Sequence, residues 1–489
     1  MAKEDQDGKI RDWADTCGSE VKAWVASVIW WCLCKTLTFH QFYLNNIDPT
    51  LCKKWFPSWR RWTGIKRFLK LSDPFKDPLN KHNRLFKVEE LFTHFVTACK
   101  ANYWPSACVA LDEAVKKFKG RCIFKQYIKN KPVKWGIKIF CVCCSRTSYL
   151  WNASFYVGKR EENDGNVSAT HDTVMKLLRP LEGKNHEVYM DNYYTGIPLL
   201  VELQKKMSIY GTGTVRTNRR GLDKQVTMKK SEEKQLKKEP GITRFSSWGN
   251  IVYASWFDKR PVHVLSTCHP PIGNDTVQHW FPARRGEKPT TASGKVLKEI
   301  PICPIVRNYR LNMGAVDTFD QYRAYIRLEM RTSKFWHVMM WFIVESALVN
   351  SFILYKITRE NANIPVELSH LEFRIAVVRA LASEWEAMGC ACQPAGVSSP
   401  NSMLKRTNAK KARVSFGKES SGRFSANDCH LSNLEDIPKR EGQKTKTRQL
   451  VCIYEGCKGR RTTKWCRACA APLCFPECFR AYHTPCNDL

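Results

Sequence analysis

The chain has 489 residues, of which 43% are hydrophobic, so its composition excludes a globally disordered polymer and its length exceeds one ordinary compact core. Lysine and arginine total 79 against 46 acidic residues, which gives a formal charge of +33. A positive field of this size attracts polyanions, so we expect DNA or RNA as the first partner and an anionic membrane surface as the second.

The 22 cysteines would suit a secreted, disulfide-rich protein, but other features argue against that class. The first fifteen residues are polar and charged and contain no apolar signal core. The cysteines also cluster densely toward the C-terminus. We therefore expect metal-binding thiols in a reducing compartment.

Residues 1–105 are expected to be mostly helical and to serve in DNA binding or dimerisation. Tryptophans alternate with basic residues between Trp55 and Phe68. This pattern is typical of an amphipathic helix with a solvated basic face, and equally of a DNA-contacting face.

Residues 106–220 predict the first part of an α/β core, because short apolar strands alternate with helical periodicity. A buried strand over 107–111 is expected to end at Asp112, and a strand over 187–190 to deliver Asp191. The other expected elements are a hairpin over 135–143 and 149–157 that turns near Ser145, helices over 171–178 (N-capped by Thr170) and 197–206, and a strand over 209–216.

Residues 221–307 are expected to be an insertion region. The segment 221–240 is rich in lysine and glutamate and predicts a loop. Strand character returns at 245–257 and 262–267, whereas 276–307 is expected to be irregular and basic.

Residues 308–389 are expected to complete the core, with 313–355 strongly helical and broken into two or three helices and a last helical region over 365–389. The stretch 338–355 is long enough to span a membrane, but Glu345 and Asn350 interrupt it. We therefore expect a buried core helix and no membrane partner.

Residues 390–448 predict a basic flexible linker, because they are polar and rich in serine, asparagine and lysine. Lys405-Arg406 and Lys410-Lys411-Ala-Arg413 resemble a nuclear import tract, so a nuclear location is expected. A disordered basic linker that follows DNA is the alternative interpretation of the same residues.

Residues 449–489 predict a cysteine-rich zinc domain. Thiolates and imidazoles at C-x4-C, C-x2-C and C-x3-C-x4-H spacing can close tetrahedral zinc sites. Seven ligands fall within 32 residues: Cys452, Cys457, Cys466, Cys469, Cys474, Cys478 and His483. Two complete zinc sites need an eighth ligand, which His430 or Cys486 could supply.

Three separated aspartates are candidates for a catalytic metal site. Asp112 and Asp191 are each expected at the end of a core strand, and Asp317 is expected to open a helix. A carboxylate at the end of a core strand is costly unless it meets a metal or hydrogen-bond donors. Phosphoryl transfer on a DNA backbone uses two divalent ions held by such oxygen ligands, which suit Mg²⁺ or Mn²⁺. Asp320 lies on the same helical face as Asp317 and could be a fourth ligand or a supporting residue.

Basic residues are expected to surround this site, as a phosphate-rich substrate requires. Three arginines follow the strand after Asp191: Arg216, Arg219 and Arg220. Eight more cationic residues follow Asp112: Lys116, Lys117, Lys119, Arg121, Lys125, Lys129, Lys131 and Lys134. A solvated face that only aids solubility is the alternative.

From about Ser19 to His483 the sequence resembles the piggyBac transposase family, including its domesticated derivatives. The resemblance rests on motifs that occur in one order along the chain: Leu111-Asp-Glu113 with Phe118-Lys-Gly-Arg121, Lys129-Asn-Lys-Pro132 with Trp135-Gly-Ile-Lys138, Met190-Asp-Asn-Tyr-Tyr-Thr195, Gly211-Thr-Gly-Thr-Val-Arg216, Gly314-Ala-Val-Asp-Thr-Phe-Asp-Gln321, Asn350-Ser-Phe-Ile353, and the cysteine-rich tail to Tyr482-His-Thr484.

The resemblance implies a ribonuclease-H-like catalytic core, a mixed sheet flanked by helices, with a β-rich insertion. By motif, Asp112, Asp191 and Asp317 are then the catalytic metal ligands and Asp320 an additional acidic residue of the site. It also implies cut-and-paste transposition at TTAA targets, a homodimer that binds double-stranded DNA, and a tail that binds two zinc ions and recognises terminal inverted repeats.

Three functions are compatible with these features. The first is an active, metal-dependent transposase, and the second is a domesticated DNA-binding protein that has kept the fold without catalysis. The third is a basic scaffold whose zinc module contacts proteins. The three intact aspartates favour the first, since a pure binder does not require them.

Overall fold

The computed structural model describes residues 15–34, 55–56, 59–73, 83–129, 133–158 and 168–388, with gaps at 238, 283–287, 289, 291–293, 326 and 331, and five short strands near the C-terminus. The chain divides into two compact units, Met1–Pro394 and Ala395–Leu489. All described elements up to residue 388 belong to the first unit.

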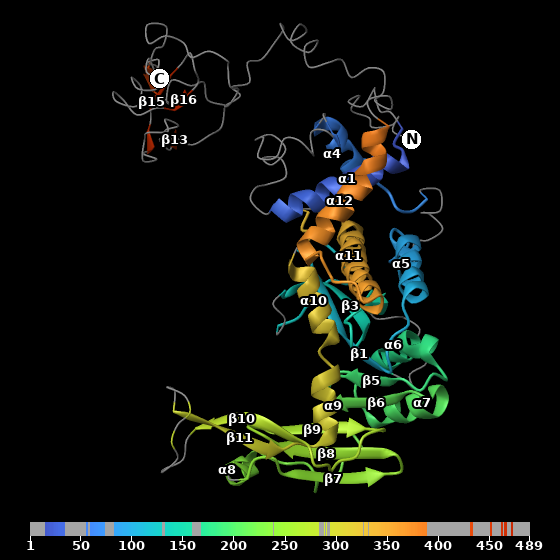
Figure 1. Ribbon diagram of the computed structural model, residues 1–489, viewed down its shortest axis with the longest axis vertical. Coiled ribbons are helices and arrows are strands. Elements are labelled where there is room, and N and C mark those ends of the chain that lie inside the picture. Colours follow the sequence, from blue (N-terminus) through green and yellow to red (C-terminus); the bar gives the residue numbers. More distant parts are fainter. Residues whose placement is uncertain are drawn as a thin grey trace. The chain divides into compact units, whose positions relative to one another are not determined.

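A nine-stranded mixed sheet forms the centre of the first unit (Figure 1). Its strands follow the order β2-β3-β1-β5-β6-β9-β8-β7, and β4 also pairs with β3. The bounds are β1 Cys108–Lys117, β2 Gln126–Tyr127, β3 Trp135–Cys144, β4 Leu150–Phe155, β5 Glu187–Met190, β6 Tyr210–Thr214, β7 Thr243–Trp248, β8 Ile251–Phe257 and β9 Pro261–Ser266.

The middle of the sheet is buried because its strands are continuous apolar runs. β1 is antiparallel to β3 and parallel to β5, which in turn is parallel to β6. Residues Val109–Leu111 and Val188–Met190 are fully buried, as expected for parallel strands that are covered on both faces. The predicted α/β class with a mixed sheet flanked by helices is confirmed.

Helices cover the sheet, and their bounds are α5 Glu89–Asn102, α6 Ala169–Leu178, α7 Ile197–Met207, α9 Pro304–Asn312, α10 Ala315–Tyr325 and α11 Phe335–Asn361, with a 3-10 turn over Arg179–Leu181. α5 and α6 lie against β4, α7 against β6, and α10 against β1 and β3.

α11 is long and apolar enough to cross a membrane by length and composition, but 72% of its most apolar window is buried inside the protein. This burial supports the predicted core helix.

A second, helical core joins the N-terminal region to α11. It is built from α1 (Gly18–Cys34), α4 (Trp59–Phe68), α12 (His370–Ala387) and the buried ring of Trp341. Trp24 lies 5.7 Å from the rings of both Trp62 and Trp341. Helix α4 therefore buries Trp62 in this core, and its basic residues lie on the same helix.

The structure corrects three predictions about local elements. β1 continues to Lys117 rather than ending at Asp112, because residues 112–117 still pair with β3. Helix α6 starts at Ala169 and is capped by Ser168, not by Thr170. The strand character expected at 245–257 is confirmed, and β7 and β8 there form a hairpin that pairs across a turn at 249–250.

The third correction concerns 276–307, which is regular rather than irregular. It contains the hairpin of β10 (Thr276–Pro282) and β11 (Lys295–Pro301), followed by α9. Exposure alternates along both strands, but the apolar Trp280 and Leu297 lie on the exposed face, so the sequence does not alternate between apolar and polar residues. The lysine-rich segment before β7 is mostly loop, with a short turn at Lys230–Glu232 and helix α8 at Glu233–Leu236.

In the second unit the structure describes only short strands. β12 (Leu431–Asn433), β15 (Lys464–Cys466) and β16 (Ala471–Pro472) form one sheet, and β13 (Leu450–Val451) pairs with β14 (Arg461–Thr462). Cys466 ends β15, and the other predicted zinc ligands and the predicted import tract lie outside the described residues.

Candidate active site

Strand register brings Asp112 and Asp191 together. In the parallel pair of β1 and β5, Leu111 lies opposite Met190, so the residue after each is an aspartate. Asp112 is inside β1, whereas Asp191 directly follows the last residue of β5. Two of the three predicted aspartates therefore lie side by side at the carboxyl end of parallel strands.

The turn after β5 fixes the Asp191 carboxylate. Asp191 Oδ1 accepts a hydrogen bond from the Tyr193 amide at 2.8 Å, and the Asp191 carbonyl accepts one from Thr195 Oγ1 at 2.8 Å. Arg216 donates to Asn192 Oδ1 at 3.1 Å, and Arg219 donates to the Tyr193 carbonyl at 3.0 Å. Two of the predicted arginines are thus held beside Asp191.

Glu113 joins these two aspartates, and its position was missed from the sequence. Ligand oxygens of Asp112, Glu113 and Asp191 all lie within 4.8 Å of one another. Asp112 Oδ1 accepts a hydrogen bond from the Glu113 amide at 2.7 Å, which folds its side chain toward that residue. Lys138 on β3 pairs with Glu113 at 2.5 Å. The name "acidic group" is used below for Asp112, Glu113 and Asp191.

The pKa values of Asp191 and Glu113 in the acidic group are shifted in opposite directions. Burial raises the pKa of Asp191; the Tyr193 amide opposes this, and the charge of Glu113 adds to it. Burial would also raise the pKa of Glu113, but hydrogen bonding to Asp112 and the charge of Lys138 outweigh it and leave that pKa below its usual value. Three half-buried carboxylates at this spacing form a hard oxygen donor set, which fits Mg²⁺ or Mn²⁺.

Asp317 is placed beside the acidic group and is not part of it. It lies in the first turn of α10, the helix that packs against β1 and β3, as the sequence predicted. Burial raises the pKa of the Tyr309 phenol on α9, and the charges of Asp191, Asp112 and Asp317 raise it further, so this phenol lies within electrostatic range of all three aspartates.

Asp320 belongs to an ion-pair network within α10 and α11. Its Oδ1 lies 2.9 Å from Arg323 Nη1, and the same guanidinium lies 3.4 Å from the buried Glu345. This pairing favours the supporting role over that of a fourth metal ligand.

A cavity of about 750 Å³ opens next to Asp317 and is lined by charged side chains of both signs. Its lining includes Lys117, Lys119 and Arg327, which are exposed, together with Asp317 and Gln321. The cavity can accept a phosphate backbone beside the acidic helix α10.

The predicted basic surface after Asp112 is only partly correct. Lys116 is buried and pairs with Glu345 at 2.5 Å, so it is a core residue and not part of the surface. Because side chains alternate along a strand, Lys117 is exposed instead, and it pairs with Glu329 at 3.1 Å. Lys131 lies outside the described residues.

Comparison with known proteins identifies the family. Residues 1–352 match the family model described as Transposase IS4. The human PiggyBac transposable element-derived protein 3 is 28% identical over 315 residues, which cover 62% of this chain and 48% of that protein. The human PiggyBac transposable element-derived protein 2 is 23% identical over 256 residues, 52% of this chain and 41% of that protein. The chain thus matches less than half the length of these two curated relatives.

A solved structure shows the same fold. The cryo-EM structure of a piggyBac transposase synaptic complex with hairpin DNA superposes with a TM-score of 0.66 and 24% identity, and covers 94% of this chain and 87% of that one. The family match covers more than half of the chain, and the relatives and the shared fold point to the same group. The chain therefore belongs to the transposase family, and the relatives named above are piggyBac-derived proteins.

Proposed function

We propose that this chain is a DNA transposase of piggyBac type, which cuts and joins transposon ends by metal-dependent phosphoryl transfer. The observation that carries the proposal is the acidic group: carboxylate oxygens of Asp112, Glu113 and Asp191 lie within 4.8 Å of one another beside α10, the helix of Asp317. The strand order β4-β3-β1-β5-β6, with only β1, β5 and β6 parallel, supports a ribonuclease-H-like core.

The proposed roles follow from position. Asp112, Asp191 and Asp317 would hold Mg²⁺ or Mn²⁺, with Asp320 supporting α10 through Arg323. Bound divalent ions supply activation of the attacking oxygen and stabilisation of the leaving one. Glu113 adds negative charge to the same site and is held there by Lys138. Lys119 and Arg327 line the cavity in which the sugar–phosphate backbone would lie.

The remaining properties are proposed by relationship. The solved piggyBac complex contains hairpin DNA, which supports double-stranded DNA as the substrate here. We further propose terminal inverted repeats and TTAA sequences as the sites of cutting and joining, a homodimer as the active form, and two zinc ions in the tail. The formal charge of +33 supports a polyanionic partner, for which a nuclear location is expected.

The test is cleavage of TTAA-flanked terminal-repeat DNA by the purified full chain with Mg²⁺. Asp191→Asn should abolish cleavage while DNA affinity changes little. The amide oxygen still accepts the hydrogen bond from Tyr193, but the negative charge that would hold the metal is lost. Asp172→Asn, which breaks the ion pair with Lys176 on α6 outside the cavity lining, is the matched control and should cleave normally. If the unmodified chain binds the DNA and never cuts it, the chain is a domesticated binder instead.

A further inference from the structure

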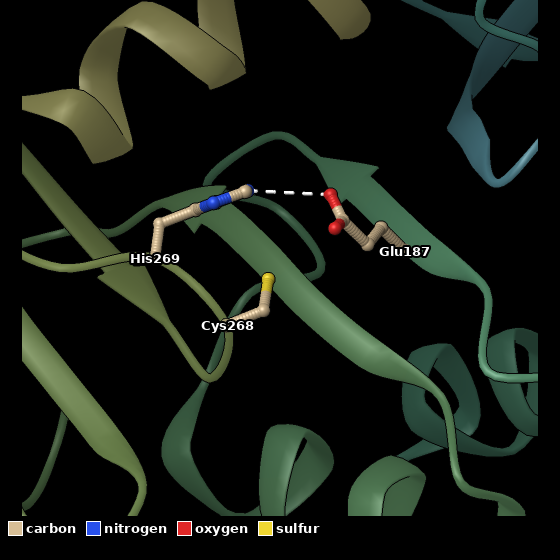
Figure 2. Close-up of side chains that lie close together, drawn as sticks. All are labelled: Glu187, Cys268 and His269. Carbon is tan, nitrogen blue, oxygen red and sulfur yellow. Dashed lines mark ion pairs between the residues drawn. The ribbon is translucent and has the colours of Figure 1, made fainter.

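A second group of ligand-type side chains lies at the opposite end of the same strands. Glu187 begins β5, while Cys268 and His269 follow β9 and point toward it (Figure 2). One ligand atom from each of the three lies within 4.8 Å of the others. Since β5 spans four residues, this group is ~13 Å from the acidic group.

Two of the spacings around Glu187 match those between ligands of one metal ion. His269 Nε2 lies 3.3 Å from Glu187 Oε2, and Cys108 Sγ at the start of β1 lies 3.7 Å from the same oxygen. In a tetrahedral zinc site with bonds of ~2.0–2.3 Å, neighbouring ligand atoms are ~3.3–3.8 Å apart. Cys108 and Cys268 are both free thiols.

Surrounding residues hold the side chains in place. Tyr189 donates a hydrogen bond to Glu187 Oε2 at 2.6 Å, and its oxygen lies 3.0 Å from His269 Nε2. Ser266 Oγ accepts from the amides of Cys268 and His269, at 3.3 and 3.2 Å, so the end of β9 turns both side chains toward β5. Such outer contacts orient metal ligands and raise affinity.

We propose that Glu187, Cys268 and His269 bind one zinc ion, with Cys108 as the fourth ligand. A set of thiolates, an imidazole and one carboxylate favours zinc over the hard cations expected at the acidic group. The ion joins the end of β9 in the insertion to β5 and β1, across β6. It is therefore a structural site, separate from the tail and from the catalytic centre.

The competing interpretation is a metal-free network in which His269, Glu187 and Tyr189 satisfy one another. Zinc content of the full chain separates the two. The tail is predicted to hold two zinc ions, so Cys466→Ser with Cys469→Ser should reduce the count without removing the ion in the core. Cys268→Ser and His269→Ala should each hold one zinc fewer than the unmodified chain, by mass spectrometry after gel filtration.

Two variants serve as controls. Cys122→Ser removes a thiol elsewhere in the core and should keep the full zinc count. Tyr189→Phe keeps every ligand, so its zinc count at saturation should be normal while its affinity falls about 10- to 100-fold. Co²⁺ in place of zinc should give thiolate charge-transfer absorption that Cys268→Ser reduces.

The decisive variant leaves the core sequence intact, so it does not depend on the folding of core mutants. In a chain with all seven predicted tail ligands replaced, one equivalent of zinc per chain is expected. Zero equivalents in that chain would overturn the proposal, as would an unchanged count in Cys268→Ser. None of these measurements uses DNA or Mg²⁺, so they are independent of transposase activity.

Discussion

Asp112 and Glu113 are neighbours in one strand, and alternation would send their side chains to opposite faces of the sheet. They nevertheless share one site, because the Asp112 carboxylate turns onto the Glu113 amide and Lys138 draws Glu113 inward. Because Lys138 keeps Glu113 ionised, the negative charge of Glu113 adds to the attraction for a divalent ion.

Glu113→Gln tests this contribution. The change preserves the shape of the side chain and removes its charge, so Mn²⁺ affinity should fall by about 10-fold or more while DNA affinity is retained. Calorimetric titration of Mn²⁺ measures the first and a gel-shift assay the second. Unchanged Mn²⁺ affinity would mean that Glu113 only pairs with Lys138. Glu384→Gln, which removes the exposed partner of Lys22 outside both the acidic group and the cavity lining, is the control.

The charged Asp191 carboxylate destabilises the metal-free fold, and a bound metal ion would remove this effect. Its folded-state pKa lies above the unperturbed 3.8, chiefly through burial. Folding therefore favours the protonated carboxyl; this stabilisation is fully present below about pH 3.8 and is lost as pH rises through the folded-state pKa.

Asp191→Asn should consequently stabilise the metal-free chain at pH 7, where the native carboxylate is charged. We expect a melting temperature higher by about 1–3 °C in the presence of a chelator. The difference should shrink at pH 4 and reverse in saturating Mn²⁺, which stabilises only a chain that binds it. A lower melting temperature for Asp191→Asn with chelator would contradict the assignment.

At the scale of elements, helix α11 contributes Glu345 to a buried ion-pair network. Glu345 is fully buried and accepts from Lys116 at 2.5 Å and from the Leu328 amide at 2.6 Å, with Arg323 at 3.4 Å. Burial lowers the pKa of Lys116, and the charge of Glu345 opposes that effect. The network ties β1 and α10 to α11, and so fixes the helix that carries Asp317.

Glu345→Leu should destabilise the fold by about 3–5 kcal/mol, because it leaves two cations buried without their carboxylate. Urea unfolding followed by circular dichroism measures the change. Lys116→Met combined with Glu345→Leu should be less harmful than Glu345→Leu alone, since fewer buried charges lack a partner. The exposed pair broken by Glu329→Gln should cost less than about 1 kcal/mol.

At the scale of the whole molecule, charge should dominate binding. With about 6–10 phosphates contacted, DNA affinity should fall by roughly 10³- to 10⁵-fold between 50 and 200 mM salt. Lys119→Gln, in the cavity beside Asp317, should lower the slope of log affinity against log salt by about one. Lys22→Gln, which breaks an exposed ion pair between α1 and Glu384 on α12, should leave that slope unchanged. A shallow slope in the unmodified chain would point to a protein partner instead.

Local patterns in the sequence determined much of the fold. The hairpin of β3 and β4, the strand that ends before Asp191, the helix of Asp317 and the buried α11 were all predicted, because periodicity and turn residues act within a few positions. The family was likewise recognised from motifs around the aspartates. Residues 276–307 were missed because the apolar Trp280 and Leu297 lie on the exposed face of β10 and β11 and hide the alternation.

Only the tertiary structure decided which side chains meet. The sequence around Glu113 does not distinguish it from a surface glutamate, whereas in the fold Lys138 of β3 lies beside it. In the same way, the sequence predicts an exposed Lys116, but α11 buries this residue against Glu345. Glu187 and His269 are 82 positions apart and meet through the pairing of β5 with β6 and of β6 with β9. Strand register is a long-range property set by packing, so no local pattern encodes such contacts.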